Sequence, residues 1–120
     1  MLPQFSYPVT VNRLDEVREQ LLRFRDERDW KQFHSAKNLA LALSIEAAEL
    51  NELYLWKETN EQVNKERVAE ELADVMAYVL YLADHYHLDL PTIVAKKIEQ
   101  NRLKYPVESS KGNATKYNAR

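Results

Sequence analysis

Residues 36–56 read AKNLALALSIEAAELNELYLW, and this stretch decides the fold. Leucine, isoleucine and alanine occupy most sides of the helix that such a sequence would form. A helix that is apolar nearly all round is buried, either in a protein core or between subunits. The sequence therefore predicts a central helix over about 36–56, with Ser35 as its N-cap.

Helical periodicity continues on both sides of this stretch. Apolar residues at steps of three and four predict further helices over about 11–28, from the polar loop to about 85, and over about 89–105. Thr59 and Gln62 fit a capping box for the third helix, Asp89 can cap the fourth, and Pro91 suits its first turn. Gly112 is the single glycine, whereas β-hairpins depend on glycine for their turns. We therefore expect an all-α fold of four helices.

The composition of the 120 residues limits the function classes. The net charge is −2, from 17 basic and 19 acidic residues, so the basic excess typical of a nucleic-acid partner is missing. The absence of cysteine excludes disulfides and a thiol nucleophile, and agrees with a cytoplasmic location. No signal peptide is apparent, and no apolar run reaches the roughly 18 residues that span a membrane. We therefore expect no membrane partner.

Four acidic residues lie among apolar neighbours on the second and third predicted helices, namely Glu46, Glu49, Glu71 and Asp74. Each pair is spaced i, i+3 and so shares one helix face. Antiparallel packing would bring the pairs together, and carboxylates in apolar surroundings are costly unless paired or metal-bound. Oxygen ligands without His or Cys favour Mg²⁺ or Mn²⁺, and such a Mg²⁺ keeps positions open for substrate phosphates. The spacing therefore indicates phosphate chemistry.

Two other interpretations of these carboxylates stay open at this stage. An E-x-x-E pair on a helix is commonly a solvated face, and the chain would then be a non-enzymatic helical oligomerisation or interaction module. Such a module would bind no magnesium and would tolerate Glu49→Ala or Asp74→Ala. A di-iron carboxylate bundle is the other alternative, but it uses two E-x-x-H motifs, and the sequence contains none.

The sequence resembles the MazG-like all-α nucleoside triphosphate pyrophosphohydrolases, and within them the single-domain dCTP pyrophosphatase branch. The family signature, E-x-x-E followed by E-x-x-D, is found at 46–49 and 71–74. Flanking segments that also match are 28–34, 38–39, 55–57, 89–91 and 101–106. The resemblance implies a four-helix bundle-type MazG-like domain over residues 1–107, assembled as a homo-oligomer. Residues 108–120 are expected to form a flexible polar tail.

The resemblance also implies an activity. It is the Mg²⁺-dependent hydrolysis of (deoxy)nucleoside triphosphates, with dCTP or a related nucleotide as substrate, to a nucleoside monophosphate and pyrophosphate. The expected role is house-cleaning of the nucleotide pool by a homotetramer, a dimer of dimers. Leu21 stands where some members of the family have a pocket histidine, which leaves the base preference open.

The resemblance assigns roles to individual residues. It implies that the metal ligands are Glu46, Glu49, Glu71 and Asp74. It implies substrate contacts from Trp30, Trp56, Tyr78, Asn101 and Tyr105. Lys97, one helical turn before Asn101, is expected to meet a phosphate. We expect Glu49 to act in catalysis as well, by orienting the attacking water.

Overall fold

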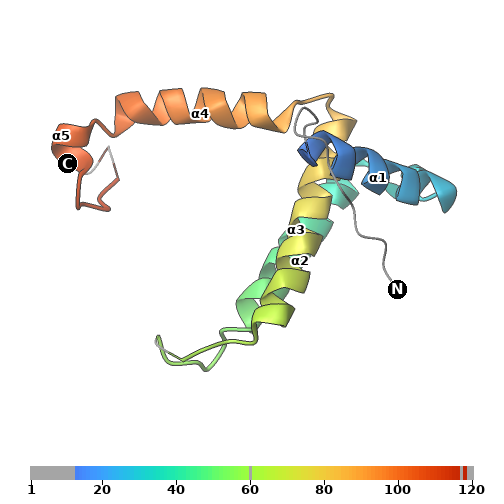
Figure 1. Cartoon of the computed structure of the whole chain (residues 1–120), viewed down its shortest axis with the longest axis horizontal. Coiled ribbons are helices and arrows are strands. Elements are labelled where there is room, and N and C mark those ends of the chain that lie inside the picture. Colours follow the sequence, from blue (N-terminus) through green and yellow to red (C-terminus); the bar gives the residue numbers. More distant parts are fainter. Residues whose placement is uncertain (1–12, 60, 117, 119–120) are drawn as a thin grey trace. The chain divides into compact units, whose positions relative to one another are not determined.

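The computed structural model describes residues 13–59, 61–116 and 118, and all regular elements among them are helices (Figure 1). The predicted all-α fold is therefore confirmed. Pro3 and Pro8 predict an extended arm over residues 1–9, and this segment lies outside the described residues. The chain divides into two compact units, Met1–Tyr86 and His87–Arg120, and each is described by itself.

The first unit is built on two antiparallel helices. Its elements are α1 (Arg13–Glu27), the 3₁₀ helix η1 (Lys31–Phe33), α2 (Ala36–Glu52) and α3 (Lys65–His85). Helices α2 and α3 lie side by side along their lengths, and α1 contacts α3 (Figure 1). Among the described residues, the buried apolar side chains are those of Leu39, Leu80, Tyr81 and Ala83. The core thus lies mainly on α3, with Leu39 contributed by α2.

Side-chain caps fix where α2 and α3 begin. The Ser35 hydroxyl accepts a hydrogen bond from the Asn38 N–H at 3.1 Å, which confirms the predicted N-cap of α2. Helix α3 is capped by Asn64, whose side-chain oxygen accepts from the Arg67 N–H at 3.2 Å. The prediction of a cap at Thr59 was wrong. Asn64 satisfies the same need for an acceptor at the helix start, five residues later.

Helix α2 ends at Glu52, before the predicted end at Trp56. Residues 53–56 form turns instead, and Trp56 has a φ of 63° in the left-handed region. For a residue other than glycine this backbone conformation costs about 1–2 kcal/mol. The Trp56 side chain is 92% exposed, so no packing within the described residues compensates for that cost.

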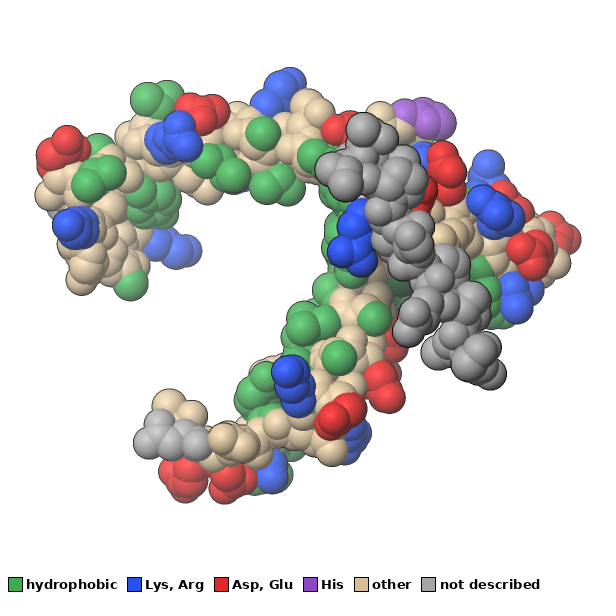
Figure 2. Space-filling view, viewed as in Figure 1, with side chains coloured by type: hydrophobic (Ala, Val, Ile, Leu, Met, Phe, Trp, Pro, Cys, Tyr) green, Lys and Arg blue, Asp and Glu red, His purple; other side chains and the backbone are tan. Residues whose placement is uncertain are grey.

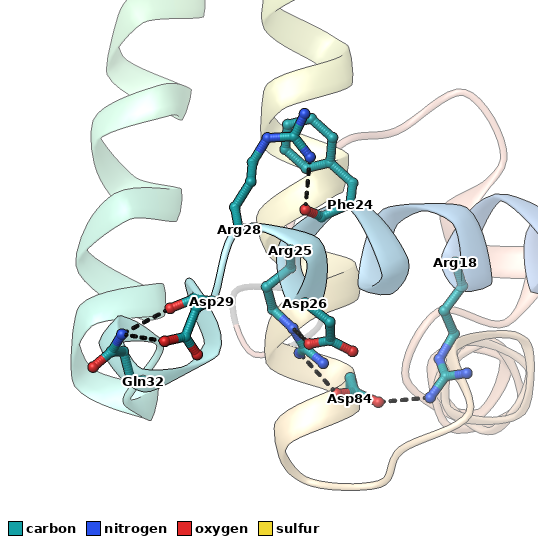
Figure 3. Close-up of polar contacts among 8 residues, drawn as sticks. All are labelled: Arg18, Phe24, Arg25, Asp26, Arg28, Asp29, Gln32 and Asp84. Carbon is teal, nitrogen blue, oxygen red and sulfur yellow. Dashed lines mark hydrogen bonds and ion pairs between the residues drawn. The ribbon is translucent and has the colours of Figure 1, made fainter.

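Asp84 joins α1 to the C-terminal part of α3 (Figure 3). Its carboxylate accepts hydrogen bonds from Arg18 at 2.7 Å and from Arg25 at 3.2 Å. Arg25 is 5% exposed and also donates to Asp26 at 2.9 Å. A buried guanidinium is tolerated only when its charge is paired, and these two carboxylates supply the partners.

The second unit contains α4 (Leu90–Lys104) and the short α5 (Val107–Ser110). Asp89 caps α4 by accepting from the Thr92 N–H at 3.2 Å and the Thr92 hydroxyl at 2.6 Å, as predicted. Pro91 lies in the first turn of α4, where a missing N–H costs nothing. Helix α5 lies partly within the expected polar tail. The proposed domain boundary at residue 107 stays a prediction.

Large apolar side chains remain exposed along α2, α3 and α4 (Figure 2). Among them are Leu41, Ile45, Leu72 and Val94, each at least half exposed. Exposed apolar surface of this extent usually marks a contact surface. Within the described part of the chain, no helix combines the length and apolarity that crossing a membrane requires.

Candidate metal centre

Three carboxylates from two helices converge on the face between α2 and α3. Oxygens of Glu46 and Glu49 on α2 and of Glu71 on α3 all lie within 4.8 Å of one another. Glu46 and Glu71 are partly buried, whereas Glu49 is exposed. The i, i+3 spacing on α2 and the antiparallel partner helix together produce this cluster. Asp74 is exposed and lies outside the group.

The cluster disfavours full ionisation of its carboxylates. Burial raises the pKa of Glu46 to about 7, helped by a hydrogen bond with Glu49 and by the charges of Glu49, Asp74 and Glu71. Burial also raises the pKa of Glu71, followed by the charge and hydrogen bond of Glu49 and the charge of Asp74, while Arg67 opposes the increase. Asp74 therefore acts electrostatically on both half-buried glutamates from outside the 4.8 Å group.

Two oxygen atoms in this cluster lack partners. Oε2 of Glu46 and Oε2 of Glu71 are buried, and neither has a hydrogen-bond partner among the described residues. A buried acceptor without a partner costs free energy, and adjacent carboxylates add repulsion to that cost. A divalent cation would satisfy both oxygens and remove the repulsion. The residues present therefore fit a hard cation with oxygen ligands.

Glu49 and Glu71 also line a hollow of about 590 Å³ at the end of the helix pair. Its other walls come from Glu52, Leu53, Leu55, Lys57, Gln62, Val63, Asn64 and Arg67. Neither basic residue belonged to the predicted site. For Arg67 the only signal in the sequence was its position one turn before Glu71, whereas the contribution of Lys57 depends on the loop conformation.

The aromatic residues assigned to the substrate lie in different parts of the first unit. Trp30 is 44% exposed and packs edge-on against Phe24, with the ring centroids 5.6 Å apart. Tyr78 is partly buried on α3, and its ring centroid lies 6.0 Å from that of Tyr81. None of Trp30, Trp56 and Tyr78 lines the hollow beside the carboxylates. The structure of the single chain therefore does not bring these three rings together in that hollow.

The loop that carries Trp30 is held by local hydrogen bonds (Figure 3). The Arg28 guanidinium donates to the Phe24 carbonyl at 2.9 Å and covers the Phe24 ring at 3.8 Å. The Gln32 side chain donates to the carbonyl and carboxylate oxygens of Asp29 at 2.9 and 3.0 Å. Asp29 has a φ of 54°, which aspartate tolerates better than most residues. These hydrogen bonds hold the backbone on both sides of Trp30.

The remaining three predicted residues belong to the second unit. Lys97 and Asn101 line a hollow of about 470 Å³ on α4, together with Ile93, Val94 and Ile98. Tyr105 follows α4, and its N–H donates to the Asn101 carbonyl at 2.8 Å. Lys97, Asn101 and Tyr105 therefore occur along one helix and its C-cap.

Comparison with known proteins identifies the family. Residues 41–119 match the MazG-like family. The chain belongs to this family. The resemblance inferred from the signature and its flanking segments is therefore confirmed. In this MazG-like chain, the matched region contains all four signature acids.

Curated relatives share sequence with most of this MazG-like chain. The dCTP pyrophosphatase 1 of Mus musculus is 46% identical over 111 residues, which is 87% of this chain and 65% of the relative. The human dCTP pyrophosphatase 1 is 40% identical over the same share of each chain. The chain thus spans just under two thirds of the length of these relatives.

A solved structure of another protein supports the fold. The crystal structure of a pyrophosphatase from Archaeoglobus fulgidus matches with a TM-score of 0.77 and 36% sequence identity. The match covers 84% of this chain and 99% of the neighbour. The helical arrangement is therefore shared with a protein described as a pyrophosphatase.

Proposed function

We propose that this chain is a nucleoside triphosphate pyrophosphohydrolase that acts on dCTP or a related (deoxy)nucleotide. The reaction would break the bond between the α- and β-phosphates and release a nucleoside monophosphate and pyrophosphate. The observation that carries this proposal is the convergence of Glu46, Glu49 and Glu71, with Oε2 of Glu46 and Oε2 of Glu71 buried and without a hydrogen-bond partner in the described part of the chain. The names of the relatives support the choice of nucleotide. House-cleaning of the nucleotide pool is the role that we propose.

Magnesium is the proposed ion, with manganese as a substitute. Glu46, Glu49, Glu71 and Asp74 would hold it, because oxygen donors without His or Cys suit these ions. Asp74 is included because its charge already acts on Glu46 and Glu71. When bound, the ion supplies positive charge to phosphate oxygens.

Glu49 is the proposed catalytic residue. It is exposed and lines the hollow, whereas Glu46 and Glu71 are partly buried. An accessible carboxylate can accept a hydrogen bond from a water molecule, orient the water toward phosphorus and take up its proton. The geometry thus favours Glu49 over its two neighbours for this role.

Substrate contacts are proposed for Trp30, Trp56, Tyr78, Lys97, Asn101 and Tyr105. Trp56 carries most of the structural support, because its ring is 92% exposed and its backbone is held in a left-handed conformation. Residues other than glycine in the left-handed region are found preferentially at active sites and ligand-binding sites. A base stacked on an indole gains about 1–3 kcal/mol.

Self-association into a homotetramer, a dimer of dimers, is also part of the proposal. Leu41, Ile45 and Leu72 are 54%, 58% and 51% exposed on the helices that carry the carboxylates. Burying these side chains against a second copy would stabilise the chain by about 25 cal/mol per Å² of apolar surface. A cytoplasmic location, expected from the cysteine-free sequence, completes the proposal.

Hydrolysis of a nucleotide panel tests the activity. Purified chain is incubated with deoxy- and ribonucleoside triphosphates, including modified cytosines, with magnesium and with a chelator, and the products are separated by chromatography. We expect monophosphate and pyrophosphate only with the metal. Glu71→Gln should lower kcat/KM at least a hundredfold, whereas Glu70→Gln, an exposed neighbour outside the cluster, should not. No turnover of any nucleotide would overturn the proposal in favour of the interaction module.

A further inference from the structure

The hollow beside the carboxylates contains positive charges that the proposed metal centre does not use. Its volume is about 590 Å³, within the usual range for small-molecule sites. One part of its wall carries the acids Glu49, Glu52 and Glu71, and the rest includes Lys57, Asn64 and Arg67. A cation held by the carboxylates would thus share one cavity with two basic side chains.

The two basic residues differ in what already contacts them. Lys57 Nζ lies 3.1 Å from Glu61 Oε2, so its charge is partly offset by an ion pair. In the part of the chain that the structure describes, the Arg67 guanidinium has neither an ion pair nor a hydrogen bond. Its backbone N–H donates to the Asn64 side chain at 3.2 Å, which fixes the residue at the start of α3. Arg67 is therefore anchored by its backbone while its guanidinium is available.

Arg67 also has the right position on α3. It lies one turn before Glu71, so the two side chains emerge on the same face of the helix. Both line the hollow, and the charge of Arg67 acts on Glu71. A phosphate group held by a cation at Glu71 would thus lie on the side of α3 that Arg67 occupies.

We propose that Arg67 binds the pyrophosphate end of the nucleotide, and that this hollow is the site of the β- and γ-phosphates. The inference rests on the proposed function. It identifies the Arg67 guanidinium as the group that makes the site prefer nucleoside triphosphates to diphosphates and monophosphates. A guanidinium presents a planar set of donors that matches two phosphate oxygens at once. The carboxylates in the same hollow repel phosphate, so the site binds pyrophosphate only when the divalent cation is present.

This assignment gives Arg67 a specificity role. A nucleoside triphosphate places two phosphates beyond the bond that breaks, a diphosphate places one, and a monophosphate places none. A contact made beyond that bond strengthens binding of the triphosphate and of the leaving pyrophosphate, and adds nothing for the monophosphate product. Arg67 therefore favours the triphosphate substrate over the monophosphate product in the same site.

Binding of inorganic pyrophosphate tests the proposal without relying on turnover. Isothermal titration of the full chain with pyrophosphate in the presence of Mg²⁺ is compared for the wild type, Arg67→Ala, Arg67→Lys and Lys65→Ala. Lys65 is a matched control, since it is an exposed cation in the same first turn and does not line the hollow. We expect Arg67→Ala to weaken binding about tenfold to a hundredfold, as loss of a charge-assisted hydrogen bond predicts. Arg67→Lys should recover part of the affinity, and Lys65→Ala should match the wild type.

A kinetic measurement supplies the second readout. The ratio of kcat/KM for dCTP to that for dCDP should fall about tenfold in Arg67→Ala and stay constant in Lys65→Ala. Pyrophosphate affinity unchanged by Arg67→Ala, or weakened equally by Lys65→Ala, would overturn the proposal while nucleotide hydrolysis by the wild type stands. Absence of hydrolysis by the wild type would instead overturn the proposed function. If Arg67→Ala fails to fold, Arg67→Lys takes its place in both measurements. A pyrophosphate affinity and a dCTP-to-dCDP ratio equal to those of the wild type in Arg67→Lys would then contradict the assignment of Arg67 to the phosphates.

Discussion

Glu46 on α2 and Glu71 on α3 bring carboxylate oxygens within 4.8 Å of each other, and Oε2 of each residue is buried without a hydrogen-bond partner among the described residues. The two residues are held on rigid helices that pack side by side, so the repulsion between them cannot be relieved by moving a loop. The helix pair is therefore destabilised by its own carboxylates until a cation or a proton neutralises them.

The metal-free chain should lose stability as pH rises through the range in which Glu46 ionises. Its pKa is about 7 in the folded chain against an ordinary value of 4.5. Between pH 4.5 and about 7, Glu46 is protonated in the folded chain and ionised in the unfolded chain. The free energy of unfolding therefore falls as the pH rises through this range, and it levels off above about pH 7. Urea unfolding with a chelator at several pH values measures this, and Glu46→Gln should flatten that part of the curve. If the free energy of unfolding of Glu46→Gln fell with pH as steeply as that of the wild type, Glu46 would not be the group responsible.

Magnesium should reverse this destabilisation and release protons when it binds. At a free concentration of 100 times the dissociation constant, a ligand of the folded state adds about 2.7 kcal/mol of stability. Below pH 7 the ion must displace the proton from Glu46, so the heat of binding should vary with the ionisation enthalpy of the buffer. Calorimetry in two buffers at one pH checks this. A heat independent of the buffer would show that Glu46 is already ionised.

Removal of Asp84 should destabilise the first unit. Asp84→Ala deletes the acceptor of Arg18 and one of the two acceptors of the buried Arg25. Hydrogen bonds to charged groups contribute about 1.5–3 kcal/mol, so the loss should be of that size. The matched change Glu99→Ala removes an exposed partner of Arg102 and should cost less than about 1 kcal/mol. If urea unfolding gave the same loss of unfolding free energy for Asp84→Ala and Glu99→Ala, the burial of Arg25 would not strengthen its ion pair with Asp84.

Trp56 should matter for binding and not for stability. Trp56→Gly removes an exposed ring and relieves the left-handed backbone, so the free energy of unfolding should stay within about 1 kcal/mol of the wild type. The KM for dCTP should rise about tenfold to a hundredfold through loss of base stacking. Steady-state kinetics with urea unfolding separates the two effects. A large loss of stability would assign Trp56 to a subunit interface instead.

A charge on the exposed apolar face of α2 should change the assembly. Leu41 is 54% exposed in the single chain, so Leu41→Glu should leave the helix intact while placing a charge on the proposed contact surface. Light scattering should then give a smaller mass than for the wild type. Lys37→Glu, a charge change at an exposed polar position of the same helix, should keep the wild-type mass.

The helices could be predicted because their start signals are local. Ser35 and Asp89 supply the acceptors that α2 and α4 need, and both caps are present. The end of α2 could not be predicted in the same way. Leu53 and Leu55 extend the apolar pattern beyond Glu52, although the backbone has already left the helix. Periodicity reports which residues are apolar and does not report where the chain turns.

The candidate site was predicted in part, for a similar reason. Glu46 and Glu49 share a face of one helix, so their proximity follows from spacing, and antiparallel packing adds Glu71. The hollow with Lys57 and Arg67 depends on the path of the loop between α2 and α3, which no pattern in the sequence describes. The positions of Lys97 and Asn101 on α4, and of Tyr105 at its C-cap, follow from helical spacing alone.

Because α2 ends at Glu52, the carboxylates and the proposed nucleotide contacts lie on different kinds of backbone. Carboxylates lie on regular helices, whereas Trp56 and Lys57 lie on the irregular connection that follows Glu52. A change of length in that connection would move the indole and the ammonium group and leave the acidic cluster where it is. Loop grafting should therefore alter the proposed selection of the nucleotide, while the carboxylates of the proposed metal centre keep their positions on α2 and α3.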